Sequence, residues 1–117
     1  MFYKKFQKLF LSHKTFIVDT IEKKNISFKQ LFHNAIKISN FLTYKENLRK
    51  GDTVIIKIEH SSTYYEIILA CAILGIRVCP LSQTINAEKY KKIKALVNPS
   101  LEITSRKEIY YNTDTTI

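Results

Sequence analysis

The stretch of residues 53–58 (TVIIKI) constrains the fold of this chain more than any other, because it is almost continuously apolar. A strand with water on one face alternates apolar and polar residues, whereas a strand covered on both faces does not. Gly51-Asp52 predicts a turn before this stretch, and a polar loop follows it at His60, Ser61 and Ser62. The pattern therefore predicts a parallel strand with helices on both sides of its sheet.

A first helix is predicted from Ser27 to residues 42–44. Ser27 and Gln30 have the spacing of a capping box, in which each side chain bonds to the backbone N–H of the other residue. Apolar residues then recur at three- and four-residue spacing, which is typical of one buried helix face. This face comprises Phe28, Leu31, Phe32, Ala35, Ile38 and Leu42.

Two further helices have their own start and stop signals. Thr63 and Glu66 predict a second capping box, for a helix that ends at Gly75. Asn86 predicts the cap of a third helix. The buried face of this third helix is expected to be Tyr90, Ile93 and Val97, and its water-facing lysines are Lys89, Lys91, Lys92 and Lys94.

Short segments rich in β-forming residues separate these helices. We expect strands at 15–21, 76–79 and 101–104, with a turn at 23–25. Alternation of strand and helix predicts an α/β fold with a mainly parallel sheet and right-handed crossovers. Residues 105–117 predict a polar, loose tail, and the apolar positions 2, 6, 9 and 10 predict a short docking helix at the N-terminus.

The composition excludes several classes of protein. The net charge is +9, yet arginine occurs only at Arg49, Arg77 and Arg106, so specific nucleic-acid recognition is not expected. The longest apolar run, 67–76, is about half of the ~20 residues that a membrane span requires. Cys71 and Cys79 lie in apolar stretches and are expected to be reduced, buried thiols of a cytoplasmic protein.

Four segments, in order and with matching spacing, carry a resemblance to a known family. They are ISFKQL at 26–31, LRKGDTV at 48–54, ACAILG at 70–75 and IRVCPL at 76–81. Together they resemble the N-terminal subdomain of the adenylate-forming superfamily, which includes acyl-CoA synthetases, luciferases and adenylation domains of nonribosomal peptide synthetases. The resemblance implies a partial AMP-binding subdomain over residues 1–104, followed by the tail at 105–117.

Complete members of that family activate a carboxylate with ATP and Mg²⁺, forming an acyl-adenylate and pyrophosphate. They hold the phosphates with a Gly-rich loop, but the two glycines of this chain, Gly51 and Gly75, are assigned to a turn and a helix cap. The resemblance therefore carries over no catalytic, cofactor-binding or metal residue. His60, Ser61 and Ser62 remain as ligand-loop candidates, since α/β folds bind ligands at carboxyl ends of strands. Helix capping is the alternative interpretation of this cluster.

Three hypotheses for function follow. The chain is a truncated N-terminal fragment of an acyl- or aminoacyl-adenylate-forming ligase and is inactive alone, or it is half of a split ligase completed by a partner chain. The third hypothesis is a non-catalytic basic interaction module. The expected partner is the remainder of the ligase or a second copy, since the sheet would lack neighbouring strands.

Overall fold

The apolar stretch after Gly51 forms the central strand of a three-stranded sheet. In the computed structural model, which describes residues 15–19, 24–107 and 109, strand β3 (Thr53–Ile56) lies between β4 (Arg77–Pro80) and β5 (Leu101–Ile103). Both neighbours run parallel to β3, and Val54 pairs with Val78 on one side and Leu101 on the other. All three of Val54, Ile55 and Ile56 are 0% exposed, so the prediction of a parallel strand covered on both faces is confirmed.

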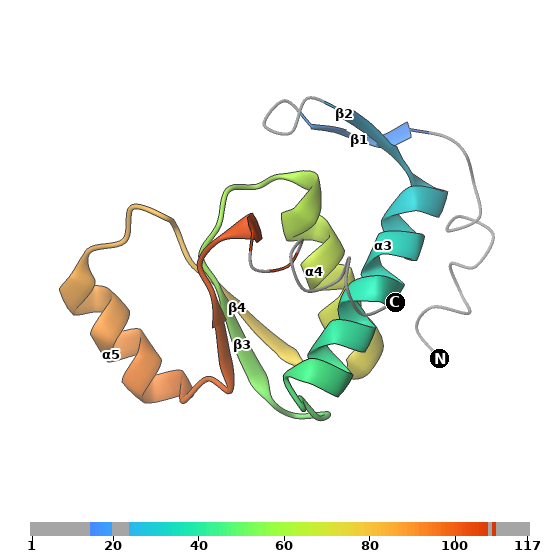
Figure 1. Cartoon of the computed structure of the whole chain (residues 1–117). Coiled ribbons are helices and arrows are strands. Elements are labelled where there is room, and N and C mark those ends of the chain that lie inside the picture. The colour runs from blue at the N-terminus through green and yellow to red at the C-terminus, as the bar shows by residue number, and fades with distance from the viewer. Residues whose placement is uncertain (1–14, 20–23, 108, 110–117) are drawn as a thin grey trace.

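Helices lie on both sides of this sheet (Figure 1). Helix α3 (Phe28–Asn40), which continues into the π-helical turn η1 (Phe41–Lys45), packs against α4 (Ser62–Leu74) on one side. Helix α5 (Ala87–Val97) lies on the other side. Because β4 and β5 flank β3, the chain crosses to one side through α4 and to the other through α5. This is the α/β architecture that the alternation predicted.

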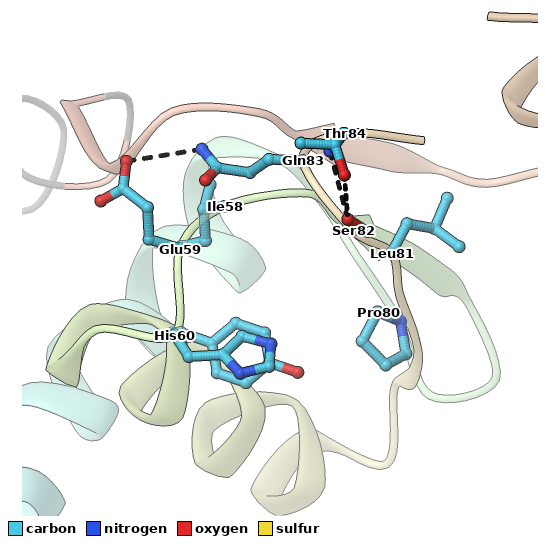
Figure 2. A pocket seen from close by; sticks show the side chains of 9 residues that line it. Ile58, Glu59, His60, Pro80, Leu81, Ser82, Gln83 and Thr84 are labelled. Carbon is cyan, nitrogen blue, oxygen red and sulfur yellow. Dashed lines mark hydrogen bonds between the residues drawn. The ribbon is translucent and has the colours of Figure 1, made fainter. Parts of the chain in front are cut away.

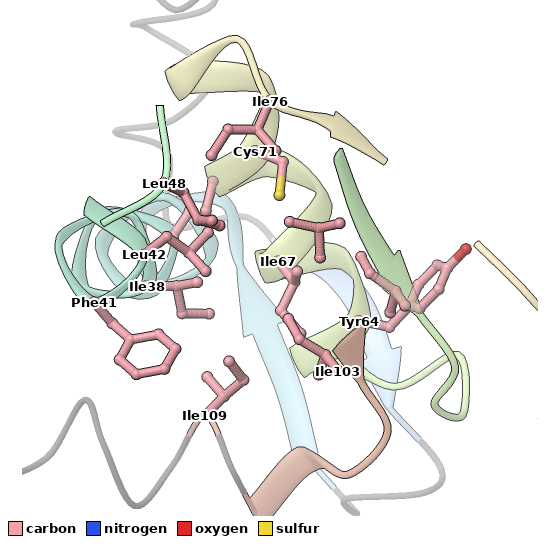
Figure 3. Close-up of a cluster of buried hydrophobic side chains, with 14 of the residues drawn as sticks. Ile38, Phe41, Leu42, Leu48, Tyr64, Ile67, Cys71, Ile76, Ile103 and Ile109 are labelled. Atoms are coloured by element: carbon pink, nitrogen blue, oxygen red, sulfur yellow. The ribbon is translucent and has the colours of Figure 1, made fainter. Parts of the chain in front are cut away.

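The main core lies between the sheet and the pair of helices α3 and α4. Figure 3 shows Ile67 and Cys71 of α4 facing the apolar side chains of α3, η1 and β5. Ile109 also belongs to this cluster and is only 2% exposed, so the buried core extends into the segment that was expected to be a loose tail. The rest of that tail beyond Ile109, like the predicted docking helix at the N-terminus, lies outside the described residues.

The first helix begins as predicted. The Gln30 backbone N–H donates to Ser27 Oγ at 3.1 Å, and the Ser27 N–H donates to Gln30 Oε1 at 3.2 Å. These two bonds satisfy donors that the first turn of a helix leaves free. The capping box at Ser27 and Gln30 is therefore confirmed.

The second predicted capping box is wrong. Helix α4 starts at Ser62, and its cap is Ser61, whose Oγ accepts from the Tyr64 N–H at 3.4 Å. Thr63 thus lies inside the first turn and is buried. Glu66 is 2% exposed and accepts a 2.7 Å hydrogen bond from Asn34 Nδ2 of α3, so its carboxylate joins the two helices instead of capping one.

The N-terminal strands also differ from the prediction. Strand β1 (Thr15–Asp19) pairs antiparallel with β2 (Lys24–Ser27), in a two-stranded sheet separate from the parallel one. Lys24 and Asn25 therefore belong to a strand rather than to a turn. Residues 24–27 contain one apolar side chain, Ile26, and therefore carry little strand signal of their own, and pairing with β1 outweighs the turn preference of Asn25.

Helix α5 turns its predicted face inward, but that face is only half-buried, and the helix has no buried residue. Polar contacts hold it to the sheet. The Tyr90 hydroxyl donates to Glu102 Oε1 of β5, and Lys94 Nζ lies 2.9 Å from Glu102 Oε2. Lys57 Nζ, in the segment after β3, lies 4.6 Å from the centre of the Tyr90 ring.

Two expectations from composition can be compared with the structure. Cys71 is buried, Cys79 is half-buried, and neither forms a disulfide. Among the described residues, the structure contains no helix with the length and apolar character needed to cross a bilayer.

Candidate functional site

The carboxyl ends of the three parallel strands meet at one edge of the sheet. Since β3 connects to β4 on one side and the chain then returns past β3 to β5, the direction of winding reverses between β3 and β5. Open α/β sheets bind ligands in the crevice at such a reversal, because the loops there diverge to opposite faces. The candidate site is therefore the edge where the loops after β3, β4 and β5 come together.

A cavity of about 560 Å³ lies at this edge, between the loop after β3 and the loop after β4 (Figure 2). His60 lines one side, Pro80 and Leu81 line the other, and Tyr64 also contributes to the lining. The His60 ring stacks on the Tyr64 ring with centroids 4.4 Å apart and planes inclined by 30°. Burial, and then the neighbouring Tyr65, raises the pKa of the Tyr64 phenol, so this ring is a neutral wall of the cavity at physiological pH.

Local hydrogen bonds fix both loops. The Ser61 N–H donates to the Glu59 carbonyl at 2.8 Å, which turns the chain from β3 into α4. On the other side the Leu81 N–H donates to the Ile56 carbonyl at 2.8 Å and extends the pairing of β4 with β3 beyond the strand. Ser82 Oγ accepts from the Thr84 N–H at 3.2 Å, which closes a tight turn at the rim.

A smaller cavity of about 190 Å³ adjoins the first one at the β3–β5 reversal. Glu59 lies between them and lines both. Its Oε1 accepts from Gln83 Nε2 at 3.4 Å, and its Oε2 lies 3.4 Å from Arg106 Nε, within ion-pair distance but without a hydrogen bond. The three loops are thus linked through one carboxylate, which balances the charge of Arg106.

The three ligand-loop candidates that the sequence indicated have different positions in the structure. His60 is exposed and lines the larger cavity, whereas Ser61 and Ser62 are 0% exposed and line neither cavity. Ser61 is the cap of α4, as the alternative interpretation of the cluster had it. A Ser–His pair for nucleophilic catalysis is not assembled here, because the Ser61 hydroxyl is turned toward the helix it caps.

Sequence reasoning missed Glu59, Gln83 and Arg106. Each follows the carboxyl end of a different parallel strand, so the rule that singled out His60 could have found them had it been applied to all three loops. Their exact partners depend on the strand order β4-β3-β5, which periodicity alone does not reveal.

The residues present do not fit ATP and Mg²⁺, the cofactors that the resemblance implies for a complete enzyme. Within the described residues no group of three or more His, Cys, Asp or Glu side chains could hold a metal ion. Gly51 and Gly75 have φ angles of +92° and +72° and serve a turn and the end of α4, so neither belongs to a phosphate-binding loop.

Comparisons with solved structures agree with this fold. The chain is similar to the Klebsiella oxytoca NpsA N-terminal subdomain in complex with 3-hydroxyanthranilyl-AMSN, with a TM-score of 0.81 and 18% identity over 98% of this chain and 31% of that chain. It is also similar to apo MatB from Rhodopseudomonas palustris, with a TM-score of 0.76 and 24% identity over 97% of this chain and 23% of that one. A third similar structure is IdnL1, with a TM-score of 0.63 and 26% identity over 67% of this chain and 16% of that one.

The chain therefore spans less than a third of the length of each of these three proteins. A comparison with curated protein sequences gave no match. The family model described as AMP-binding enzyme, however, matches residues 9–116, which is nearly the whole chain. By its sequence and its fold, this chain belongs to the AMP-binding enzyme family and has the fold of an N-terminal subdomain of the adenylate-forming enzymes.

Proposed function

We propose that this chain forms the N-terminal scaffold of an ATP-dependent acyl- or aminoacyl-adenylate-forming ligase and does not catalyse adenylation alone. One observation carries the proposal: the chain superimposes over 98% of its length on the NpsA N-terminal subdomain but spans only 31% of it. A chain that matches part of a larger domain over almost its whole length is expected to act as part of such a domain.

The chemistry of the candidate site supports inactivity in isolation. Among the described residues that line the two cavities there is one carboxylate, Glu59, and it is already engaged by Gln83 and Arg106. Binding a nucleotide triphosphate needs several backbone N–H groups or cations directed at the phosphates, and catalysis needs a positioned cation at the reacting phosphate. These groups would come from the remainder of the ligase.

The remainder is the partner that this proposal requires. It would be supplied either by further residues of the same polypeptide or by a second chain, in which case the protein is half of a split ligase. In both cases the loops around His60, Gln83 and Arg106 would form one wall of a site completed from outside. The substrate would be a carboxylic or amino acid, which the remainder selects.

ATP–pyrophosphate exchange tests the first part of the proposal. The purified chain, supplied with Mg²⁺, ATP, pyrophosphate and a panel of carboxylic and amino acids, is expected to give no exchange above a protein-free blank. Exchange by the isolated chain with any of these acids would refute the proposal.

A chimera tests the second part. This chain replaces the structurally matched segment of the NpsA N-terminal subdomain, and binding of 3-hydroxyanthranilyl-AMSN is measured by calorimetry. The chimera is expected to bind, whereas the NpsA subdomain with that segment deleted is expected not to bind. A folded chimera that does not bind would count against a scaffold role.

A further inference from the structure

Helix α5 and its two connecting loops have no backbone hydrogen bond to any other described part of the chain. The Leu81 N–H donates to the Ile56 carbonyl and the Ser100 N–H donates to the Thr53 carbonyl, each at 2.8 Å. Between these two anchor points, in residues 82–99, all of which the structure describes, the backbone hydrogen bonds are local to the helix and its turns. We call residues 82–99 the α5 flap.

Polar contacts between side chains hold the α5 flap to the sheet. The Tyr90 hydroxyl donates to Glu102 Oε1, and Lys94 Nζ lies 2.9 Å from Glu102 Oε2, so both contacts depend on one carboxylate. Lys57 Nζ lies 4.6 Å from the centre of the Tyr90 ring. A further hydrogen bond, from Gln83 to the loop after β3, is 3.4 Å long and exposed. Exposed polar contacts contribute little to stability individually, so these contacts hold the flap weakly.

The apolar side of α5 adds a limited contact with the sheet. Tyr90, Ile93 and Val97 point inward but are only half-buried, and no residue of the helix is buried. The stabilisation gained from apolar contact follows the area removed from water. Three half-buried side chains therefore stabilise the closed flap less than the buried side chains of α4 stabilise the main core.

A row of three side chains lies under the flap. Ile55 of β3 pairs with Cys79 of β4 on one side and Glu102 of β5 on the other, and paired residues of neighbouring strands point to the same face of a sheet. Glu102 contacts α5, whereas Val54 and Ile56 belong to the main core on the opposite face. The row of Cys79, Ile55 and Glu102 is therefore the face of the sheet that α5 covers.

The main core is independent of the α5 flap. Its buried cluster is built from α3, η1, α4, the strands β3 and β5, and Ile109. Among the described residues, none of the flap belongs to this cluster or to the half-buried side chains packed against it. Local opening of a protein costs only the contacts that the opening unit makes. The flap can thus leave the sheet while the cluster stays packed.

We propose that the α5 flap opens from the sheet as a unit while the main core stays folded, and that this opening controls access to the Cys79 thiol and the Ile55 side chain. The flap is a conformational device of the chain itself, and the inference does not rest on the proposed function. Elements that move in regulation come from parts of a fold with few buried contacts, as here. The closed flap covers the row beneath it, and the open flap exposes an apolar side chain and a thiol.

The two native cysteines report on the two faces of the sheet. Cys79 lies under the flap and is half-buried. Cys71 of α4 is buried in the main core, where burial raises the pKa of its thiol to about 12. The rate of N-ethylmaleimide labelling at each cysteine is measured in the full chain by peptide mass spectrometry. At low reagent concentration, the rate at a shielded thiol is proportional to the equilibrium constant of the opening that exposes it.

Two alanines provide a matched pair of variants. Ala95 of α5 and Ala72 of α4 are both exposed, and each lies two residues before the last residue of its helix, Val97 and Leu74 respectively. Glycine is less favourable than alanine inside a helix, and the difference corresponds to about a two- to fivefold change in an equilibrium constant. Because both alanines are exposed, each substitution acts on the stability of its own helix.

The two variants are expected to separate opening of the flap from unfolding of the chain. Ala95→Gly destabilises the closed flap, so it should raise the labelling rate at Cys79 about two- to fivefold. Ala72→Gly destabilises α4, which stays folded when the flap opens. It should therefore leave the rate at Cys79 unchanged and raise the rate at Cys71, which only unfolding of the core exposes. In the wild type, Cys79 should react at least about tenfold faster than Cys71.

Either of two labelling results would overturn the inference. If Ala72→Gly accelerates Cys79 as much as Cys71, both thiols are exposed by unfolding of the whole chain. If Ala95→Gly leaves the rate at Cys79 unchanged, that thiol reacts without opening of the flap.

Amide hydrogen exchange gives a readout that needs no cysteine. Urea below the unfolding transition is expected to change exchange little in α5, because opening of the flap exposes little surface, and to accelerate exchange in α4. The same urea dependence in both helices would also refute a separate opening of α5.

Discussion

Helices α4 and α5 connect the same three strands but differ in almost every property that determines where a helix lies. The 13 residues of α4 include one charged side chain, and seven of them are buried. The 11 residues of α5 include one glutamate and four lysines, and none of them is buried. The two faces of one small sheet are therefore covered by helices of opposite character.

The difference lies in how each helix is held. Helix α4 is held by apolar packing against α3 and the sheet, whereas α5 is held by Tyr90, Lys94 and their shared partner Glu102. The free energy gained from apolar packing is proportional to the apolar area buried, whereas each exposed polar contact contributes little to stability. Helix α4 thus has the character of an interior element, and α5 that of an outer one.

Truncation of the inner side of α4 is expected to have the largest effect. Ile67 is 0% exposed within the core, so Ile67→Ala should lower the free energy of unfolding by about 3 kcal/mol through lost burial and the cavity left behind. Leu96 of α5 is 84% exposed, and Leu96→Ala should change it by less than about 0.5 kcal/mol. Urea unfolding followed by circular dichroism measures both, and similar losses would refute the contrast between the helices.

Removal of a carboxylate should likewise lower the free energy of unfolding more in α4 than in α5. Glu66→Ala removes the acceptor of the Asn34 side chain and is expected to cost about 2 kcal/mol, because a part-buried donor then lacks its partner. Glu88 lies exposed in the first turn of α5, so Glu88→Ala should cost about 0.5 kcal/mol at most. The same urea titration decides, and a Glu66→Ala variant as stable as Glu88→Ala would show that Glu66 does not join α3 to α4.

The attachment of α5 should depend on pH. Hydrogen bonds from Tyr90 and then Lys94 lower the pKa of Glu102, so its stabilising contribution is present above the unfolded value of about 4.3 and is lost as the pH falls through the lowered folded value. Burial and then Glu102 raise the pKa of Tyr90 to about 12, so the contribution of the neutral phenol is complete below about pH 10 and is lost as the pH rises through 12.

Amide chemical shifts in NMR spectra recorded from pH 7 to pH 3 test the predicted loss of the Glu102 contribution at low pH. As the pH falls, the amide shifts of α5 are expected to change at a higher pH than those of α4, because α5 loses its contact with the sheet first. Tyr90→Phe removes the hydrogen bond to Glu102, so the change in α5 should begin at a higher pH in this variant. Simultaneous changes in both helices, with the variant identical to the wild type, would exclude a separate attachment of α5.

The sequence predicted the parts of this fold that depend on local patterns. The buried strand after Gly51-Asp52, the capping box at Ser27 and the helix end at Gly75 all follow from spacing and residue type within a few positions, and each is observed. The pairing of β1 with β2 was missed, because it depends on a partner strand rather than on the residues of β2 themselves.

The site was predicted less well for the same reason. His60 was found because it lies in the polar loop after the most apolar strand, whereas the meeting of Glu59, Gln83 and Arg106 depends on the order β4-β3-β5. Glu66 was misread as a capping residue, since a Thr-x-x-Glu spacing does not reveal that Ser61 starts the helix earlier. Local rules place elements, and long-range contacts decide which polar residues are used for structure.

The smallest effect is expected on the lysine-rich side of α5. Lys91 and Lys92 are exposed, and long cationic side chains in water contribute little to stability. The double variant Lys91→Gln, Lys92→Gln should therefore change the free energy of unfolding by less than about 0.5 kcal/mol. If these lysines only solvate the helix, neither protein should bind a single-stranded oligonucleotide at 0.15 M salt, as followed by fluorescence anisotropy. Binding by the wild type that the double variant loses would instead give α5 a partner of its own. It would also support the third hypothesis, a basic interaction module.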